Sequence, residues 1–152
     1  MKSCHAAAAV FASLFLGLTA SQAAACSCRK ISEKEQFSSA DLVVRGRMKL
    51  VTFGVDLPLS QGDEPPTPLT RGDFEIDKVL KGKLKEKTLS IYTGAGVGDC
   101  GRLDAFLSAA FYYNDDKFAV WEFALSKAKH NGQTLYFTNI CEYMKAPTPR
   151  QE

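Results

Sequence analysis

Apolar and polar residues alternate in several stretches of the chain, which is the pattern of strands that bury one face. The clearest stretch is 42–53, where basic residues occupy the positions between the apolar ones. The residues expected on its buried face are Val44, Gly46, Met48 and Leu50. Those expected on its exposed face are Arg45, Arg47 and Lys49. The same reasoning predicts four further strands, at 74–80, 89–93, 117–123 and 134–141.

A capping sequence predicts a helix over 32–40. Ser32 can cap the first turn, and Glu35 follows three residues later, as in a capping box. Phe37 is the expected contact between this helix and the core. Residues 103–113 fit either a short helix or an irregular connection, and their pattern does not decide between the two.

The segments between the predicted strands carry turn signals. Residues 56–71 include four prolines and show no periodicity, so we expect a long exposed connection on which the fold does not depend. Turns are expected at 81–83 and 114–116, and Asn131-Gly132 predicts a hairpin. Five short strands with a long first connection predict a five-stranded OB-fold-like β-barrel with short flanking helices.

The first 25 residues have the features of a secretory signal. Lys2 provides a short basic start, residues 6–20 are mostly apolar, and Ala23-Ala24-Ala25 fits the small residues that precede a cleavage site. The apolar run is too short for a convincing membrane span. We therefore expect cleavage after Ala25 and a secreted or periplasmic protein.

The expected mature protein has a single domain at 26–145 and a loose C-terminal tail at 146–152. Lys2 is the one charged residue in the signal, so 18 basic and 17 acidic residues remain of the 19 and 17 in the whole chain. This near balance argues against nucleic acid as a partner. We expect a monomer.

Four cysteines follow the predicted cleavage site, and an even number in an exported protein favours two disulfides. A bond between Cys26 and Cys28 would close a strained ring, so each is expected to pair with Cys100 or Cys141. A zinc site built from the four thiolates is the alternative, which the Cys-x-Cys spacing fits poorly. Lipidation of Cys26 is another alternative, although Ala23 stands where a lipidation signal usually has leucine.

Candidate catalytic groups are few. The glycine-rich stretch 94–101 lacks the Gly-Lys-Ser/Thr that a phosphate-binding loop needs, so we interpret it as a loop that folds closely and presents Cys100. His130 is the one histidine after the predicted signal, and no nucleophile is paired with it in a recognisable pattern. We therefore expect no enzymatic activity and no cofactor.

Short motifs in a fixed order point to a family. They are Cys26-Ser27-Cys28 at the expected mature start and then 37–45, 74–76, 81–82, 91–93, 100–101 and 140–143. In this ordered set the chain resembles the N-terminal, netrin-like domain of the tissue inhibitors of metalloproteinases. The resemblance covers nearly all of residues 26–145 and places 140–143 at the end of the last strand.

The resemblance implies that Cys26 pairs with Cys100 and Cys28 with Cys141. It also implies that the α-amino group and carbonyl oxygen of Cys26 chelate the catalytic zinc of a protease, at the coordination position that water otherwise holds. The residues implied to contact the protease are Ser27, in the S1′ pocket, and Cys28, Arg29, Lys30, Gly98 and Asp99.

Two positions depart from the family's pattern. Lys30 stands where a proline is usual, and Ser38 stands where the vertebrate members have a cysteine. The alternative interpretation is a netrin-like extracytoplasmic module that binds another protein without inhibiting a protease, since a fold does not by itself define a function.

Overall fold

The computed structural model describes residues 26–57, 68–95, 99–130 and 132–148. The predicted signal, residues 58–67 of the predicted long connection and Gly98 lie outside the described residues. The elements in chain order are α2 (Glu33–Ser39), β1 (Leu42–Asp56), β2 (Pro68–Lys81), β3 (Thr88–Thr93), α3 (Leu103–Phe111), β4 (Trp121–His130), β5 (Gln133–Phe137) and β6 (Met144–Lys145).

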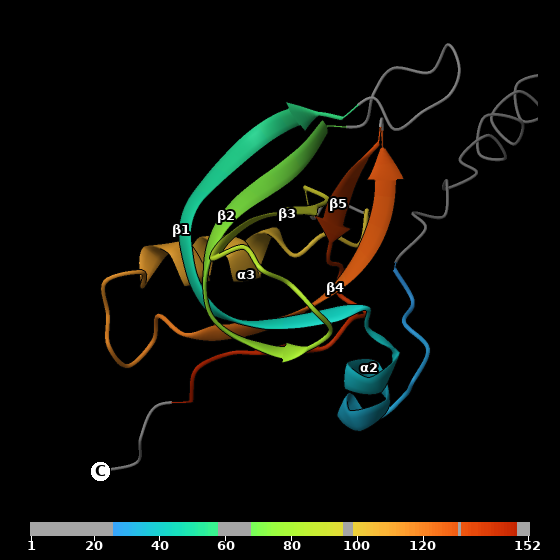
Figure 1. The fold of residues 1–152 in the computed structure, drawn as a ribbon, viewed down its shortest axis with the longest axis horizontal. Coiled ribbons are helices and arrows are strands. Elements are labelled where there is room, and N and C mark those ends of the chain that lie inside the picture. The colour runs from blue at the N-terminus through green and yellow to red at the C-terminus, as the bar shows by residue number, and fades with distance from the viewer. Residues whose placement is uncertain (1–25, 58–67, 96–98, 131, 149–152) are drawn as a thin grey trace, which may run out of the picture.

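Strand β1 closes the sheet because it pairs with two other strands. It runs antiparallel to β2 along most of its length and antiparallel to β4 from Leu42 to Gly46. β2 pairs with β3, β3 makes a short parallel contact with β5, and β5 pairs with β4. Five strands therefore form a closed ring in the order β1-β2-β3-β5-β4 (Figure 1). The two-residue β6 adds to β4. The prediction of a mainly β fold is confirmed.

The core lies between the ring and helix α3. The largest fully buried side chains include Phe74, Phe106, Phe123, Leu42 and Met48. Phe106 of α3 meets Phe123 of β4 edge-on, with ring centroids 5.7 Å apart. Burying each such side chain contributes about 1.5–3 kcal/mol, so this packing holds α3 firmly against the ring.

One residue of β1 is on the face opposite to the predicted one. Leu50 is 53% exposed, whereas Met48 is fully buried. The register between β1 and β2 shifts between these two residues, and such an irregularity moves the following side chains to the other face of the sheet. Val51 packs against the core in place of Leu50.

Several predicted boundaries are also wrong. β1 continues to Asp56 and β4 continues to His130, beyond their predicted ends at 53 and 123. β2 begins at Pro68, so the end of the predicted connection belongs to a strand, where proline is tolerated as a first residue. β4 begins at Trp121 rather than at 117, because the Asp115 carboxylate accepts hydrogen bonds from the backbone of Lys117 and Phe118 and holds both in a turn. β5 ends at Phe137, well before 141.

The helices and the hairpin agree with the sequence pattern. Ser32 Oγ accepts from the Glu35 backbone at 3.3 Å and Glu35 Oε2 accepts from the Ser32 backbone at 2.8 Å, which confirms the capping box of α2. α3 resolves the ambiguity at 103–113 in favour of a helix. His130 pairs with Gln133, as the predicted hairpin requires. Among the described residues, no helix has the length and apolar character needed to cross a membrane.

Candidate functional site

The segment that precedes α2 contains most of the residues implied to contact a protease. Cys26 and Cys28 are partly buried, whereas Ser27, Arg29 and Lys30 are exposed. Figure 1 draws this segment in blue as it runs to α2 without forming a helix or strand. We call residues 26–30 the N-terminal edge.

Two disulfides fix the N-terminal edge to distant parts of the chain. Cys26 is bonded to Cys100, with 5.5 Å between their Cα atoms, and Cys28 is bonded to Cys141, with 5.1 Å between theirs. These bonds confirm the pairing that the resemblance implied. Since the two bonded cysteines are only two positions apart, the backbone of the N-terminal edge is anchored on both sides of Ser27.

The first anchor is the loop around Cys100. Asp99 accepts hydrogen bonds from the backbone of Ala95 at 2.5 Å and of Gly101 at 2.9 Å, which closes the loop on itself. Gly101 lies so near Gly94 that a Cβ atom would come within 2.1 Å of the Gly94 carbonyl oxygen. Cys100 has a φ of 60°. The close fold expected from the glycines is therefore present in the described part of this loop.

The second anchor is the turn around Cys141. The resemblance placed residues 140–143 at the end of the last strand, but they follow β5 as a turn. Asn139 Oδ1 accepts from the Cys141 backbone at 2.8 Å, and Glu142 Oε2 accepts from the Asn139 backbone at 3.2 Å. Burial raises the pKa of Glu142 above its ordinary value, because a low-dielectric surrounding disfavours the carboxylate.

Arg102 joins the two anchors. Its side chain is buried and donates to three backbone carbonyls of the turn, those of Asn139 at 2.5 Å, Ile140 at 3.1 Å and Glu142 at 2.5 Å. The Ile140 backbone in turn donates to the Cys100 carbonyl at 3.0 Å. Hydrogen bonds from a charged group are strong in a buried setting. They therefore hold the loop around Cys100 and the turn around Cys141 together as one rigid unit.

Sequence reasoning did not identify Arg102. A single arginine after a glycine carries no pattern, and its role depends on a turn about 40 positions further along the chain. The cysteines, by contrast, could be identified because their number and the expected export required partners. Arg29, Lys30 and Asp99 lie within the described residues, whereas Gly98 does not.

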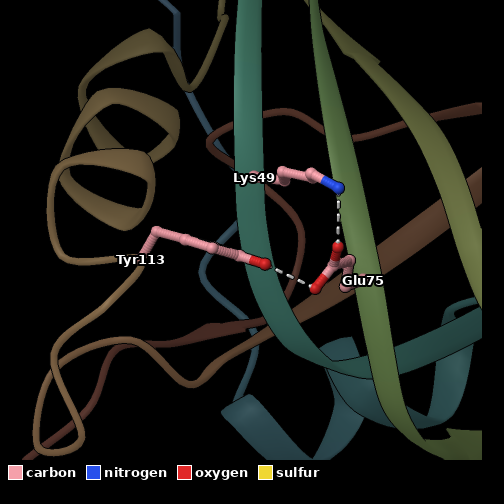
Figure 2. Close-up of polar contacts among 3 residues, drawn as sticks. All are labelled: Lys49, Glu75 and Tyr113. Atoms are coloured by element: carbon pink, nitrogen blue, oxygen red, sulfur yellow. Dashed lines mark hydrogen bonds and ion pairs between the residues drawn. The ribbon is translucent and has the colours of Figure 1, made fainter.

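A second polar cluster links the chain after α3 to the sheet. The Tyr113 hydroxyl donates to Glu75 Oε2 at 2.7 Å, and Lys49 pairs with Glu75 Oε1 at 3.2 Å. Figure 2 shows both side chains pointing toward the Glu75 carboxylate. The hydrogen bond from Tyr113, and then that from Lys49, lowers the pKa of Glu75 below its ordinary value. Arg47 also donates to the Tyr113 carbonyl, at 3.3 Å. We interpret this cluster as a structural tie, because a carboxylate held ionised by two donors is a poor general acid.

The described residues offer little for other chemistry. No group of three or more histidine, cysteine, aspartate or glutamate side chains within them could hold a metal ion. His130 is the last residue of β4 and pairs with Gln133, so it belongs to the strand and not to the turn beside it.

Comparisons with known proteins do not assign the chain to a family. No protein-family model matches this sequence, and a search of curated proteins finds no match to it.

Proposed function

We propose that the protein is an exported inhibitor of zinc metalloproteases that acts through its N-terminal edge. Removal of residues 1–25 would make Cys26 the first residue. Its α-amino nitrogen and carbonyl oxygen would then displace the water on the protease zinc as a two-atom chelate. The inhibitor needs no cofactor of its own, and it performs no catalysis.

The observation that carries this proposal is the double anchoring of an exposed segment. Ser27, Arg29 and Lys30 are exposed, yet their backbone is fixed through Cys26 and Cys28. Ordering a mobile segment costs about 0.5–1.5 kcal/mol for each immobilised side chain on binding. A segment that is already ordered avoids much of this cost, which is what an inhibitor that mimics a substrate requires.

The remaining contacts follow from the order of residues along the N-terminal edge. Ser27 would enter the S1′ pocket of the protease, and Cys28, Arg29 and Lys30 would lie along the next primed subsites. Asp99 would lie beside them, because its neighbour Cys100 is bonded to Cys26. Gly98 would belong to the same contact and lies outside the described residues.

We also propose that the ring of strands is an OB-type barrel of the netrin-like kind. Its support is the closure of five strands through β1 and β4, together with the two disulfides. Two disulfides are typical of proteins that mature in oxidising compartments, which agrees with the secreted or periplasmic location that we propose.

The decisive experiment compares the processed protein with a form that carries one extra alanine before Cys26. N-terminal sequencing of the exported protein should begin at Cys26. Against a panel of metzincin-type proteases, the processed form should inhibit, and the extended form should lose at least a hundredfold in affinity because its amine is displaced from the zinc. Both forms should keep the same disulfides and melting temperature.

The pH dependence tests the same chelate. An ammonium group cannot coordinate zinc, and the ordinary pKa of an α-amino group is about 8. Affinity for the zinc-loaded protease should therefore fall about tenfold for each pH unit below about 7. Ser27→Arg should change which proteases are bound, without removing this pH dependence.

Equal inhibition by the processed and extended forms would rule out chelation. Absence of inhibition by both would favour a netrin-like module that binds another protein.

A further inference from the structure

Helix α3 carries an apolar stripe on the side turned away from the core. Leu103, Leu107 and Phe111 follow one another at intervals of four residues and therefore lie on one side of the helix. Leu107 is 45% exposed and Phe111 is 81% exposed. The buried residues of the helix are Ala105, Phe106 and Ala109. Leu107 and Phe111 thus present their apolar side chains to solvent, whereas Leu103 is partly buried at the start of the helix.

A hollow lies at the beginning of this stripe. It has a volume of about 320 Å³, and its lining residues are Ala95, Gly101, Leu103, Asp104 and Leu107. Gly101 directly follows Cys100, which is bonded to Cys26, and Ala95 is hydrogen-bonded to Asp99 on the other side of Cys100. The hollow therefore lies beside Cys100, the first anchor of the N-terminal edge.

We propose that the hollow and the α3 stripe are a second contact surface for the same metalloprotease, receiving an apolar side chain from the protease surface beside its active-site cleft. This inference rests on the function proposed above, because it takes the N-terminal edge as one part of a larger interface. Exposed apolar side chains that gather next to a binding segment are typical of protein–protein contact sites.

The size of a stable interface supports this assignment. A specific complex buries about 800 Å² on each partner and involves about 20–30 residues on each side. The N-terminal edge has five residues and spans at most about 17 Å when fully extended, which is too small an area by itself. The stripe from Leu103 to Phe111 adds about 12 Å of helix that begins at the first anchor.

Substitutions on the exposed stripe test the proposal. Leu107→Gln and Phe111→Gln should each raise the inhibition constant at least tenfold, because each removes an apolar contact at the interface. Leu50→Gln is the matched control, since Leu50 is 53% exposed and lines a different groove, with Asp73 and Ser90. It should leave the inhibition constant within twofold of the wild-type value.

Thermal unfolding of each variant shows whether the fold is kept. If a glutamine variant unfolds below the wild-type temperature by more than a few degrees, Leu107→Ala and Phe111→Ala take its place, with the same expected loss. Inhibition constants within twofold of the wild type for both stripe variants would overturn the proposal, while loss of inhibition in the alanine-extended form would still support the chelate. If the processed protein inhibits no protease, the proposed function and this inference fall together.

Discussion

Tyr143 links three parts of the molecule through one side chain. It is 8% exposed, and its hydroxyl donates to Glu122 Oε2 of β4 at 2.5 Å. Its ring meets that of Phe37 in α2 edge-on, with centroids 5.3 Å apart. Burial and then the hydrogen bond to Glu122 raise the pKa of the Tyr143 hydroxyl above its ordinary value. The neutral phenol is therefore the form that the folded protein favours.

Tyr143→Phe should lower the free energy of unfolding at pH 7 by about 1–2 kcal/mol, because a hydrogen bond to a carboxylate is lost. Above pH of about 10 the unfolded tyrosine ionises while the folded one does not, so the wild type loses stability as the pH rises. The difference between wild type and variant should shrink between pH 9 and pH 11. Urea unfolding at several pH values measures it, and a constant difference would contradict the raised pKa.

At the level of single residues, the sequence predicts contacts that depend on neighbours in the chain. Phe37 was expected to reach the core, and it packs against Tyr143. Arg102 and the exposed position of Leu50 could not be predicted. Both depend on distant backbone, the carbonyls of a turn in one case and the register with β2 in the other.

At the level of elements, local signals placed α2 and the β4–β5 hairpin correctly, because a capping box and a two-residue turn act over a few residues. The predicted boundaries of β4 and β5 were wrong because side-chain hydrogen bonds form turns next to both strands. The Asp115 side chain delays the start of β4, and the turn bound by Arg102 follows the early end of β5. The alternation of apolar and polar residues continues into these turns, so it does not indicate where the strands begin or end.

Helix α2 begins at Glu33, shortly after the N-terminal edge, and Ser32 caps its first turn. Ser32→Ala should lower the free energy of unfolding by about 1 kcal/mol, because the first turn loses a backbone partner. Ser39→Ala is the matched control. Ser39 Oγ donates to the Gln36 carbonyl one turn earlier and caps no free backbone N–H group, so this variant should stay within about 0.5 kcal/mol of the wild type. Denaturant unfolding compares the two, and equal costs would contradict the role of the cap.

On the scale of the whole molecule, the disulfides hold the N-terminal edge to points 74 and 113 residues further along the chain. Cross-links over loops of this length restrict the unfolded chain strongly, and removing one from a small domain costs about 2–5 kcal/mol. The same bonds attach the N-terminal edge to the loop around Cys100 and to the turn around Cys141. Stability and the shape of the proposed binding surface therefore depend on the same bonds.

The double variant Cys28→Ser/Cys141→Ser separates these two effects. It keeps Cys26 and its bond to Cys100, so the chelating amine is retained. We expect a loss of about 2–5 kcal/mol in the free energy of unfolding. We also expect at least a tenfold loss of inhibition at a temperature where the variant is folded, because Arg29 and Lys30 must then be ordered on binding. An unchanged free energy of unfolding would contradict the prediction that the bond between Cys28 and Cys141 stabilises the fold.

The positions of the bonded cysteines also set an order of events during biosynthesis. Cys26 and Cys28 leave the ribosome first, whereas Cys100 and Cys141 follow only after the intervening strands have been made. Contacts over such separations form late, since the chain between them must first be brought together. The N-terminal edge is thus expected to be completed late, although it is synthesised before both of its bonded partners. Under the proposed function, a chain on the export route that lacks one of the two bonds would bind a protease more weakly, and full affinity would arise only when maturation ends.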